Sequence, residues 1–159
     1  MRVLYVEDNP VDADLARRAF ARGKMPIELE VVGTWHEAMA RLAAPNYDVI
    51  LTDINLPDGD GMRLLDHIRS RDLPLAVVVV SGLEEEEAIV AALRAGADDF
   101  VIKRADYLDR LSSILGDALI RNQLMRAQRP ERVRALALGL SPHAGRQIGR
   151  HLDRYAPHI

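Results

Sequence analysis

The sequence lacks several features that would place it in particular protein classes. It contains no cysteine, which excludes disulfide bonds, thiolate metal sites and a cysteine nucleophile. Its longest apolar run, Leu75–Val80, is far too short to span a bilayer. Met1 leads directly into a strand pattern, with no signal-peptide pattern before it. We therefore expect a cytoplasmic protein without a membrane segment.

The charges are unevenly distributed along the chain. Residues 1–120 hold 13 Lys and Arg against 22 Asp and Glu, whereas residues 121–159 hold 8 Arg against 2 acids. This pattern predicts an acidic domain with a basic tail. The tail could be a solvated helix or could dock on its own acidic body. Aromatic residues are not interleaved with its arginines and it has no large apolar face, so we do not expect binding to nucleic acid or membranes.

Five short apolar runs alternate with helical patterns and predict an α/β fold. The runs are Val3–Val6, Leu29–Val32, Val49–Leu51, Ala76–Val80 and Phe100–Ile102. The first, third and fourth are continuous, as expected of parallel strands that are buried on both faces. Strict alternation of strand and helix requires a parallel sheet with helices on both faces. We predict a doubly wound, five-stranded sheet in the order 2-1-3-4-5, flanked by five helices.

Start and stop signals delimit the predicted helices. Asn9-Pro10 is typical of a cap followed by proline at the first helical position, and Thr34–Glu37 matches a capping box. Gly61 precedes the third helix. The acids Glu84–Glu87 suit the first turn of the fourth helix, where the helix dipole favours negative charge. The fifth helix is expected from about Asp106 towards Arg129.

Polar side chains follow four of the predicted strands. Glu7 and Asp8 end the first strand, Asp53 the third, Ser81 the fourth and Lys103 the fifth. In an open parallel sheet, ligands bind at the carboxyl ends of the strands, near the point where the strand order reverses. The sequence therefore predicts that carboxylates, a hydroxyl and an ammonium group meet in one crevice.

These groups favour phosphoryl-transfer chemistry. Carboxylates that lie close together repel one another, and Mg²⁺, or Mn²⁺ in its place, would neutralise them. We expect Asp8 and Asp53 to bind the metal directly. Glu7 would contact it through a water molecule or would hold its ligands without touching it. Asp53 is the predicted nucleophile, which would form an aspartyl phosphate. Lys103 can pair with Asp53 and then with a phosphoryl oxygen, and Ser81 can hydrogen-bond another.

Four segments of the chain resemble the receiver domain of bacterial two-component response regulators, a flavodoxin-like phosphoacceptor domain. They are Val6–Pro10, Leu51–Gly61, Val79–Gly82 and Gly96–Lys103. The resemblance covers residues 1–122, so we predict a receiver domain over 1–122. Residues 123–159 would then be a basic helical extension or the remnant of a following module.

The resemblance implies further roles. Ser81 would move towards the phosphoryl group and Phe100 would turn inward, which would change the face formed by the fourth helix, fifth strand and fifth helix. Asn55 would offer a backbone carbonyl to the metal. A sensor histidine kinase or phosphotransfer protein would supply the phosphoryl group, and a downstream protein would read the changed face. Where the family usually has a cis-proline after the lysine, Arg104 stands here, so either a costly non-proline cis bond is kept or the loop takes another geometry.

Other residues have simpler structural interpretations. Asp12 and Asp14 are more simply read as solvated, Asp58 and Asp60 as turn residues, and the four glutamates as surface charges. A seam of Leu108, Leu111, Leu115, Ala118, Asn122 and Met125 could pack on the sheet or form a homodimer.

Rival functions receive less support from the residues. Phosphatases of the haloacid dehalogenase superfamily also form an aspartyl phosphate, but they carry a second Asp two residues after the nucleophile, where Asn55 stands here. We expect no enzyme activity beyond self-catalysed phosphoryl transfer and autodephosphorylation. A receiver excised from a hybrid histidine kinase or from a DNA-binding regulator remains the alternative.

Overall fold

The computed structural model describes residues 1–44, 46–82 and 84–128. Its centre is a five-stranded parallel sheet in the order β2-β1-β3-β6-β7. These strands are β1 (Arg2–Val6), β2 (Glu28–Val32), β3 (Val49–Asp53), β6 (Ala76–Ser81) and β7 (Asp99–Ile102). β6 and β7 are the fourth and fifth strands of this sheet, so the predicted order 2-1-3-4-5 is confirmed. The short strands β4 (Asn55–Leu56) and β5 (Gly59–Asp60) form a separate antiparallel hairpin that the sequence did not suggest.

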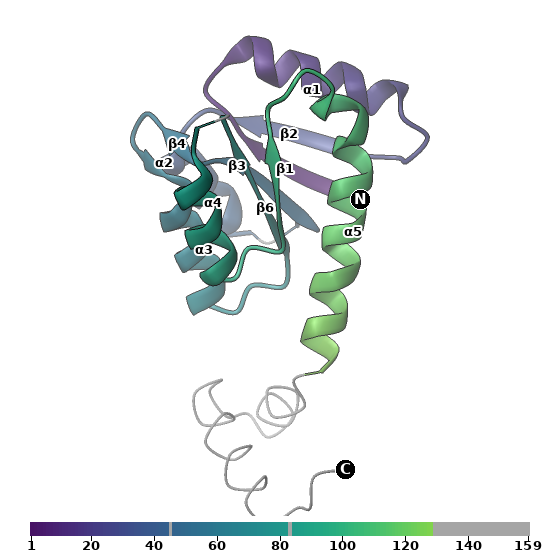
Figure 1. The fold of residues 1–159 in the computed structure, drawn as a ribbon. Coiled ribbons are helices and arrows are strands. Elements are labelled where there is room, and N and C mark those ends of the chain that lie inside the picture. Colours follow the sequence, from purple (N-terminus) through teal and green to yellow (C-terminus); the bar gives the residue numbers. More distant parts are fainter. Residues whose placement is uncertain (45, 83, 129–159) are drawn as a thin grey trace, which may run out of the picture. The chain divides into compact units, whose positions relative to one another are not determined.

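Helices cover both faces of the sheet, as Figure 1 shows. They are α1 (Pro10–Arg22), α2 (Trp35–Leu42), α3 (Gly61–Ser70), α4 (Glu86–Arg94) and α5 (Tyr107–Ala127). Buried side chains of α1 and α5 form one core cluster with one face of the sheet, and those of α2, α3 and α4 form a second cluster with the other. Because both faces are covered, the carboxyl edge of the strands is left as the place where polar side chains gather. Residues Met1–Asn122 form one compact unit.

Side-chain caps begin the first three helices. Asn9 Oδ1 accepts a hydrogen bond from the backbone amide of Val11 at 2.9 Å, and Thr34 Oγ1 accepts one from Glu37 at 3.1 Å, as predicted. The third helix begins at Gly61 itself, and its cap is Asp60, whose Oδ1 accepts from Arg63 N at 2.9 Å. Asp60 is therefore a helix cap as well as a turn residue.

The seam along α5 packs on the chain's own sheet as far as Asn122. Leu111, Leu115 and Ala118 are buried in one core cluster. Asn122 is also buried, and its side-chain amide donates a hydrogen bond to Asp98 at 3.3 Å. The packing interpretation therefore accounts for this polar position. The predicted extension beyond residue 128, with its arginines, lies outside the described residues. Within the described part, no helix combines the length and apolar character needed to cross a membrane.

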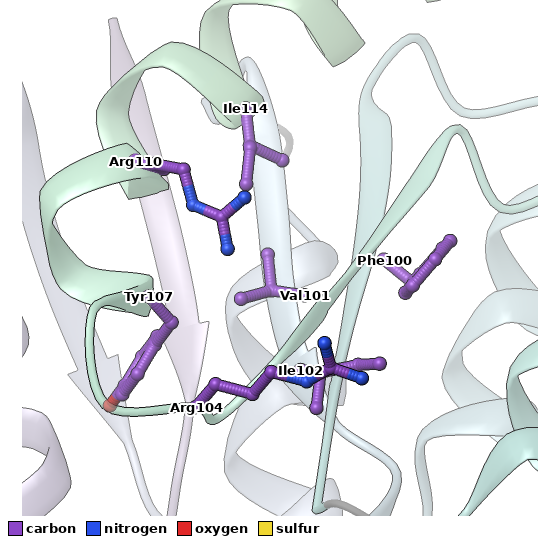
Figure 2. Close-up of a pocket in the computed structure, with 7 residues that line it drawn as sticks. All are labelled: Phe100, Val101, Ile102, Arg104, Tyr107, Arg110 and Ile114. Atoms are coloured by element: carbon purple, nitrogen blue, oxygen red, sulfur yellow. The ribbon is translucent and has the colours of Figure 1, made fainter.

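The loop after β7 has no cis bond at Arg104. The Lys103–Arg104 peptide is trans, Arg104 N donates to Ile102 O at 2.7 Å, and Tyr107 N donates to Arg104 O at 3.1 Å. Of the two alternatives left by the missing proline, the loop therefore adopts the geometry without a cis bond. Arg104 also lines a pocket of about 360 Å³ beside β7 and α5, shown in Figure 2. The lining residues are Phe100, Val101, Ile102, Arg104, Tyr107, Arg110 and Ile114.

Candidate functional site

Three carboxylates meet at the carboxyl edge of the sheet. Glu7 and Asp8 directly follow β1, and Asp53 ends the neighbouring strand β3, in which Thr52 is paired with Val6. One oxygen from each of the three carboxylates lies within 4.8 Å of the others. The convergence predicted from the strand ends is therefore present. The Glu7 side chain is only 1% exposed, whereas that of Asp53 is 17% exposed, so Asp53 is the more accessible of the two.

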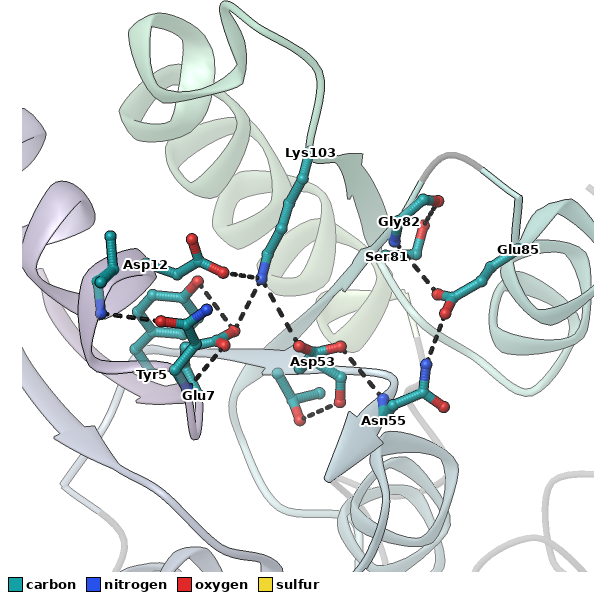
Figure 3. Close-up of polar contacts among 12 residues, drawn as sticks. Tyr5, Glu7, Asp12, Asp53, Asn55, Ser81, Gly82, Glu85 and Lys103 are labelled. Carbon is teal, nitrogen blue, oxygen red and sulfur yellow. Dashed lines mark hydrogen bonds and ion pairs between the residues drawn. The ribbon is translucent and has the colours of Figure 1, made fainter. Parts of the chain in front are cut away.

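Lys103 reaches this cluster from the end of β7, as Figure 3 shows. Its ammonium group donates to Asp12 Oδ2 at 2.7 Å and to Glu7 Oε2 at 3.1 Å, and lies 3.6 Å from Asp53 Oδ2. The expectation that Asp12 is solvated is therefore wrong. A signal was available, because Asp12 precedes the buried Ala16 by four residues and so shares its side of α1.

Burial and charge shift the pKa values of these groups. Burial raises the pKa of Glu7 above its ordinary value, and the hydrogen bond from Lys103 only partly opposes this shift. Burial lowers the pKa of Lys103, but its hydrogen bonds to Asp12 and Glu7 outweigh burial and leave that pKa raised. Tyr5, whose hydroxyl donates to Glu7 at 3.4 Å, also has a raised pKa because of burial and the nearby Glu7. Lys103 is therefore a permanent cation in this site.

The donor set suits a hard divalent cation. The ammonium group of Lys103 lies among the carboxylates of Glu7, Asp12 and Asp53. Asp8 adds a fourth carboxylate beside Glu7 and Asp53. Such an excess of negative charge in a partly buried site is unfavourable unless a cation reduces it. Carboxylate oxygens are the ligands that Mg²⁺ and Mn²⁺ prefer. The residues present thus fit a bound divalent metal.

A chain of hydrogen bonds joins the end of β3 to the segment after β6. The backbone amide of Asn55 donates to Asp53 Oδ1 at 3.1 Å, and the Asn55 side chain donates to Glu85 at 2.5 Å. Glu85 also accepts from Gly82 N at 3.3 Å. Glu85 precedes α4 and turns towards Asn55, so it is more than the surface charge expected from the sequence.

Ser81 and Phe100 lie where the sequence placed them, at the end of β6 and within β7. Ser81 is buried, and its hydroxyl donates to Gly82 O at 3.3 Å rather than to Asp53. Phe100 is partly buried, packs against the core cluster under α2, α3 and α4, and lines the pocket beside α5.

The likeness to known proteins agrees with this geometry. Residues 3–115 match the family model described as "Response regulator receiver domain". The chain belongs to this family. A receiver domain is a phosphoacceptor signalling module and not a classical enzyme. The acidic pocket of Glu7, Asp8 and Asp53 in this receiver is consistent with a phosphoacceptor site.

Relatives and solved structures of receivers match over most of the chain. The regulatory protein AtoC of Escherichia coli is 35% identical over 118 residues, which are 74% of this chain and 25% of AtoC. The receiver domain of a LuxO repressor from Vibrio parahaemolyticus is 28% identical, with a TM-score of 0.70 over 79% of this chain and 95% of that one. The Mn²⁺-bound response regulator Rcp1 is 27% identical, with a TM-score of 0.62 over 72% of this chain and 89% of that one.

The chain spans less than half of the length of curated relatives such as AtoC. In those relatives the matched segment is only part of a larger protein, so whole-protein activities do not transfer to this chain by similarity alone.

Proposed function

We propose that this receiver accepts a phosphoryl group on Asp53 in a reaction that depends on Mg²⁺. The observation that carries the proposal is the position of Asp53: its carboxylate is partly exposed, lies within 4.8 Å of Glu7 and Asp8 oxygens, and faces the Lys103 ammonium at 3.6 Å. A sensor histidine kinase or a phosphotransfer protein is the donor in this proposal. The family membership and the Mn²⁺-bound relative Rcp1 support it.

The protein's own groups supply most of the chemistry. An Asp53 oxygen attacks phosphorus, and the bond between phosphorus and the donor's leaving atom breaks as the new P–O bond forms. Lys103 offers a positive charge to the phosphoryl oxygens. Glu7, Asp8, Asp53 and the backbone carbonyl of Asn55 would hold the metal. When bound, Mg²⁺ or Mn²⁺ would neutralise negative charge on the phosphoryl group during transfer.

Ser81 and Phe100 are the proposed switch residues. The Ser81 hydroxyl, which donates to Gly82 O at 3.3 Å, would turn to a phosphoryl oxygen on Asp53. Phe100 borders a pocket and is only partly buried, so it has room to turn inward. New contacts at the site would bias the face formed by α4, β7 and α5 between two conformations.

A protein partner or a second copy of the chain would read this face. Val90 and Leu93 on α4 and Ile120 on α5 are 46%, 39% and 56% exposed, so this face offers apolar side chains to a partner. We propose a downstream protein partner, with a homodimer as the second candidate. Light scattering with and without beryllofluoride separates the two candidates, because only dimerisation doubles the molar mass.

The wider setting is part of the same proposal. In this proposal residues 1–122 are the receiver domain, and residues 123–159 are a basic helical extension or the remnant of a following module. The greater length of relatives such as AtoC supports an origin in a larger regulator, either DNA-binding or of the hybrid-kinase type. A cytoplasmic location agrees with the family, and we do not assign nucleic-acid binding to this chain.

Asp53→Asn tests the site assignment. The variant is expected to lose phosphorylation by acetyl phosphate and Mg²⁺, because an amide oxygen is a poor nucleophile for this transfer. Intact-protein mass spectrometry measures the added phosphoryl group. Asp66→Asn is the matched control, since Asp66 is exposed on α3. Labelling of Asp53→Asn at the rate of the unmodified protein would contradict the assignment.

A further inference from the structure

The nearest carboxylate to Lys103 is not the phosphoacceptor. The Lys103 Nζ atom lies 2.7 Å from Asp12 Oδ2, 3.1 Å from Glu7 Oε2 and 3.6 Å from Asp53 Oδ2. A separation of 3.6 Å is longer than an N–H···O hydrogen bond, so the Asp53 contact is electrostatic only. Figure 3 shows the ammonium between Asp12 and Asp53, with Asp12 on the α1 side.

Asp12 and Glu7 together define the position of the ammonium group. Glu7 is itself fixed, because it accepts hydrogen bonds from Asn9 N at 3.1 Å and from the Tyr5 hydroxyl at 3.4 Å. Asp12 stands on the first turn of α1 with a side chain that is 25% exposed. Water therefore screens its pairing with Lys103 only in part. Two of the three N–H donors of Lys103 are taken by carboxylates other than Asp53.

We propose that Asp12 is a positioning residue that holds Lys103 back from Asp53 in the unphosphorylated protein. This inference rests on the proposed phosphorylation of Asp53. A phosphoryl group on Asp53 attracts the ammonium, and movement towards it lengthens the short bond to Asp12. Asp12 thus opposes the phosphorylated state, in competition with the phosphoryl oxygens for one cation.

The variant Asp12→Asn tests this competition for Lys103. Beryllofluoride, added with Mg²⁺, is the probe that takes the place of the phosphoryl group. The variant is expected to reach half-saturation at a roughly three- to tenfold lower beryllofluoride concentration, since a charge-assisted hydrogen bond no longer opposes binding. Binding is followed by NMR through the amide signals of Asp53 and Asn55. A small probe avoids any effect of Asp12 on the docking of a protein donor.

Two control variants separate positioning from charge. Asp14→Asn removes the same charge from the same helix, but Asp14 pairs with Arg18 at 3.0 Å. Its half-saturation is expected to stay within about twofold of the unmodified protein, because the charge is exposed and screened. Asp12→Glu keeps a carboxylate, so its half-saturating beryllofluoride concentration is expected to be close to that of the unmodified protein.

The lysine side chain itself provides a readout that does not depend on affinity. The sequence contains two lysines, Lys24 and Lys103, so lysine-selective ¹³C labelling gives two assignable side-chain signals. In Asp12→Asn without beryllofluoride, the Lys103 signal is expected to move towards its beryllofluoride-bound position, whereas Lys24 stays unchanged.

The possible failures are distinguishable. If the unmodified protein binds beryllofluoride but Asp12→Asn binds no tighter than Asp14→Asn, or its Lys103 signal does not move, the role of Asp12 is wrong. If the unmodified protein neither binds beryllofluoride nor is phosphorylated on Asp53, the proposed function itself is wrong.

Discussion

At the scale of single residues, Gly61 lets the chain fold back against Asp53. A Cβ atom at this position would lie 2.6 Å from Asp53 O, closer than real Cβ contacts allow. The Gly61 amide also donates to Ile54 O at 2.8 Å, which keeps the two segments together. The main chain around Asp53 therefore depends on the absence of a side chain at Gly61.

Gly61→Ala is expected to lower the free energy of unfolding by about 1–3 kcal/mol, because an added methyl group forces a backbone shift. Urea denaturation measures the change. Gly82→Ala is the control, since a Cβ there meets no heavy atom within 4 Å. Equal stability of the two variants would show that the loop near Asp53 yields easily.

Some residues of the site could be predicted from the sequence, whereas others could not. Asp53, Glu7 and Lys103 stand directly after apolar runs, and the carboxyl ends of parallel strands meet at one edge, so their convergence follows from local pattern. Asp12 and Glu85 stand at the starts of helices, among other acids. The spacing of Asp12 to Ala16 indicates only that Asp12 shares the buried side of α1. The partners of Asp12 and Glu85 depend on how α1 and α4 pack against the sheet, which no local pattern specifies.

At the scale of elements, Asp58 ties the β4–β5 hairpin to the start of α2. Its carboxylate accepts from the backbone amides of Trp35 at 2.7 Å and His36 at 3.1 Å, and it also contacts the His36 ring. Arg63 on α3 lies over the Trp35 ring, with its Cζ atom 4.3 Å from the ring centroid, and links α3 to the same helix start. The turn residue expected from the sequence is thus also a cap for a helix more than 20 residues earlier.

These contacts make the stability contributed by Asp58 depend on pH. The His36 ring and then the two backbone amides lower the pKa of Asp58 from 3.8 to about 2. A carboxyl group with a lowered pKa in the folded state stabilises the fold above its unfolded pKa and loses this effect as the pH falls through its folded pKa. The stabilising effect is therefore complete above about pH 4 and declines towards pH 2.

Asp58→Asn is expected to be less stable than the unmodified protein at pH 5, with a smaller difference at pH 3. Urea midpoints at the two pH values measure this change, and Asp66→Asn serves as the exposed control. A difference that stays constant down to pH 2.5 would show that the charge of Asp58 is not what stabilises the fold.

At the scale of the whole molecule, Asp98 joins elements that are distant in the sequence. It accepts from Arg69 on α3 at 2.7 Å, from Val77 N on β6 at 2.8 Å and from Asn122 on α5 at 3.3 Å. Its side chain is 11% exposed. Helices on opposite faces of the sheet are therefore held by one carboxylate.

Asp98→Ala is expected to cost about 3 kcal/mol of unfolding free energy, because the Val77 amide and the Asn122 carboxamide lose their acceptor and the Arg69 guanidinium loses its carboxylate partner. Asp99→Ala is the neighbouring control. Asp99 pairs with Arg121, whose side chain is 52% exposed, so its loss is expected to cost less than about 1 kcal/mol. Chemical denaturation measures both, and equal losses would contradict a joining role for Asp98.

The sequence by itself determined the sheet, its strand order and the groups at its carboxyl edge. Continuous apolar runs, helix caps and the alternation of strand and helix are local signals that leave one simple topology. Only the tertiary structure decided the β4–β5 hairpin and the partners of the charged groups. Lys103 and Asp12 are 91 residues apart, and their pairing depends on side-chain directions that become defined only when α1 and β7 pack into the same domain.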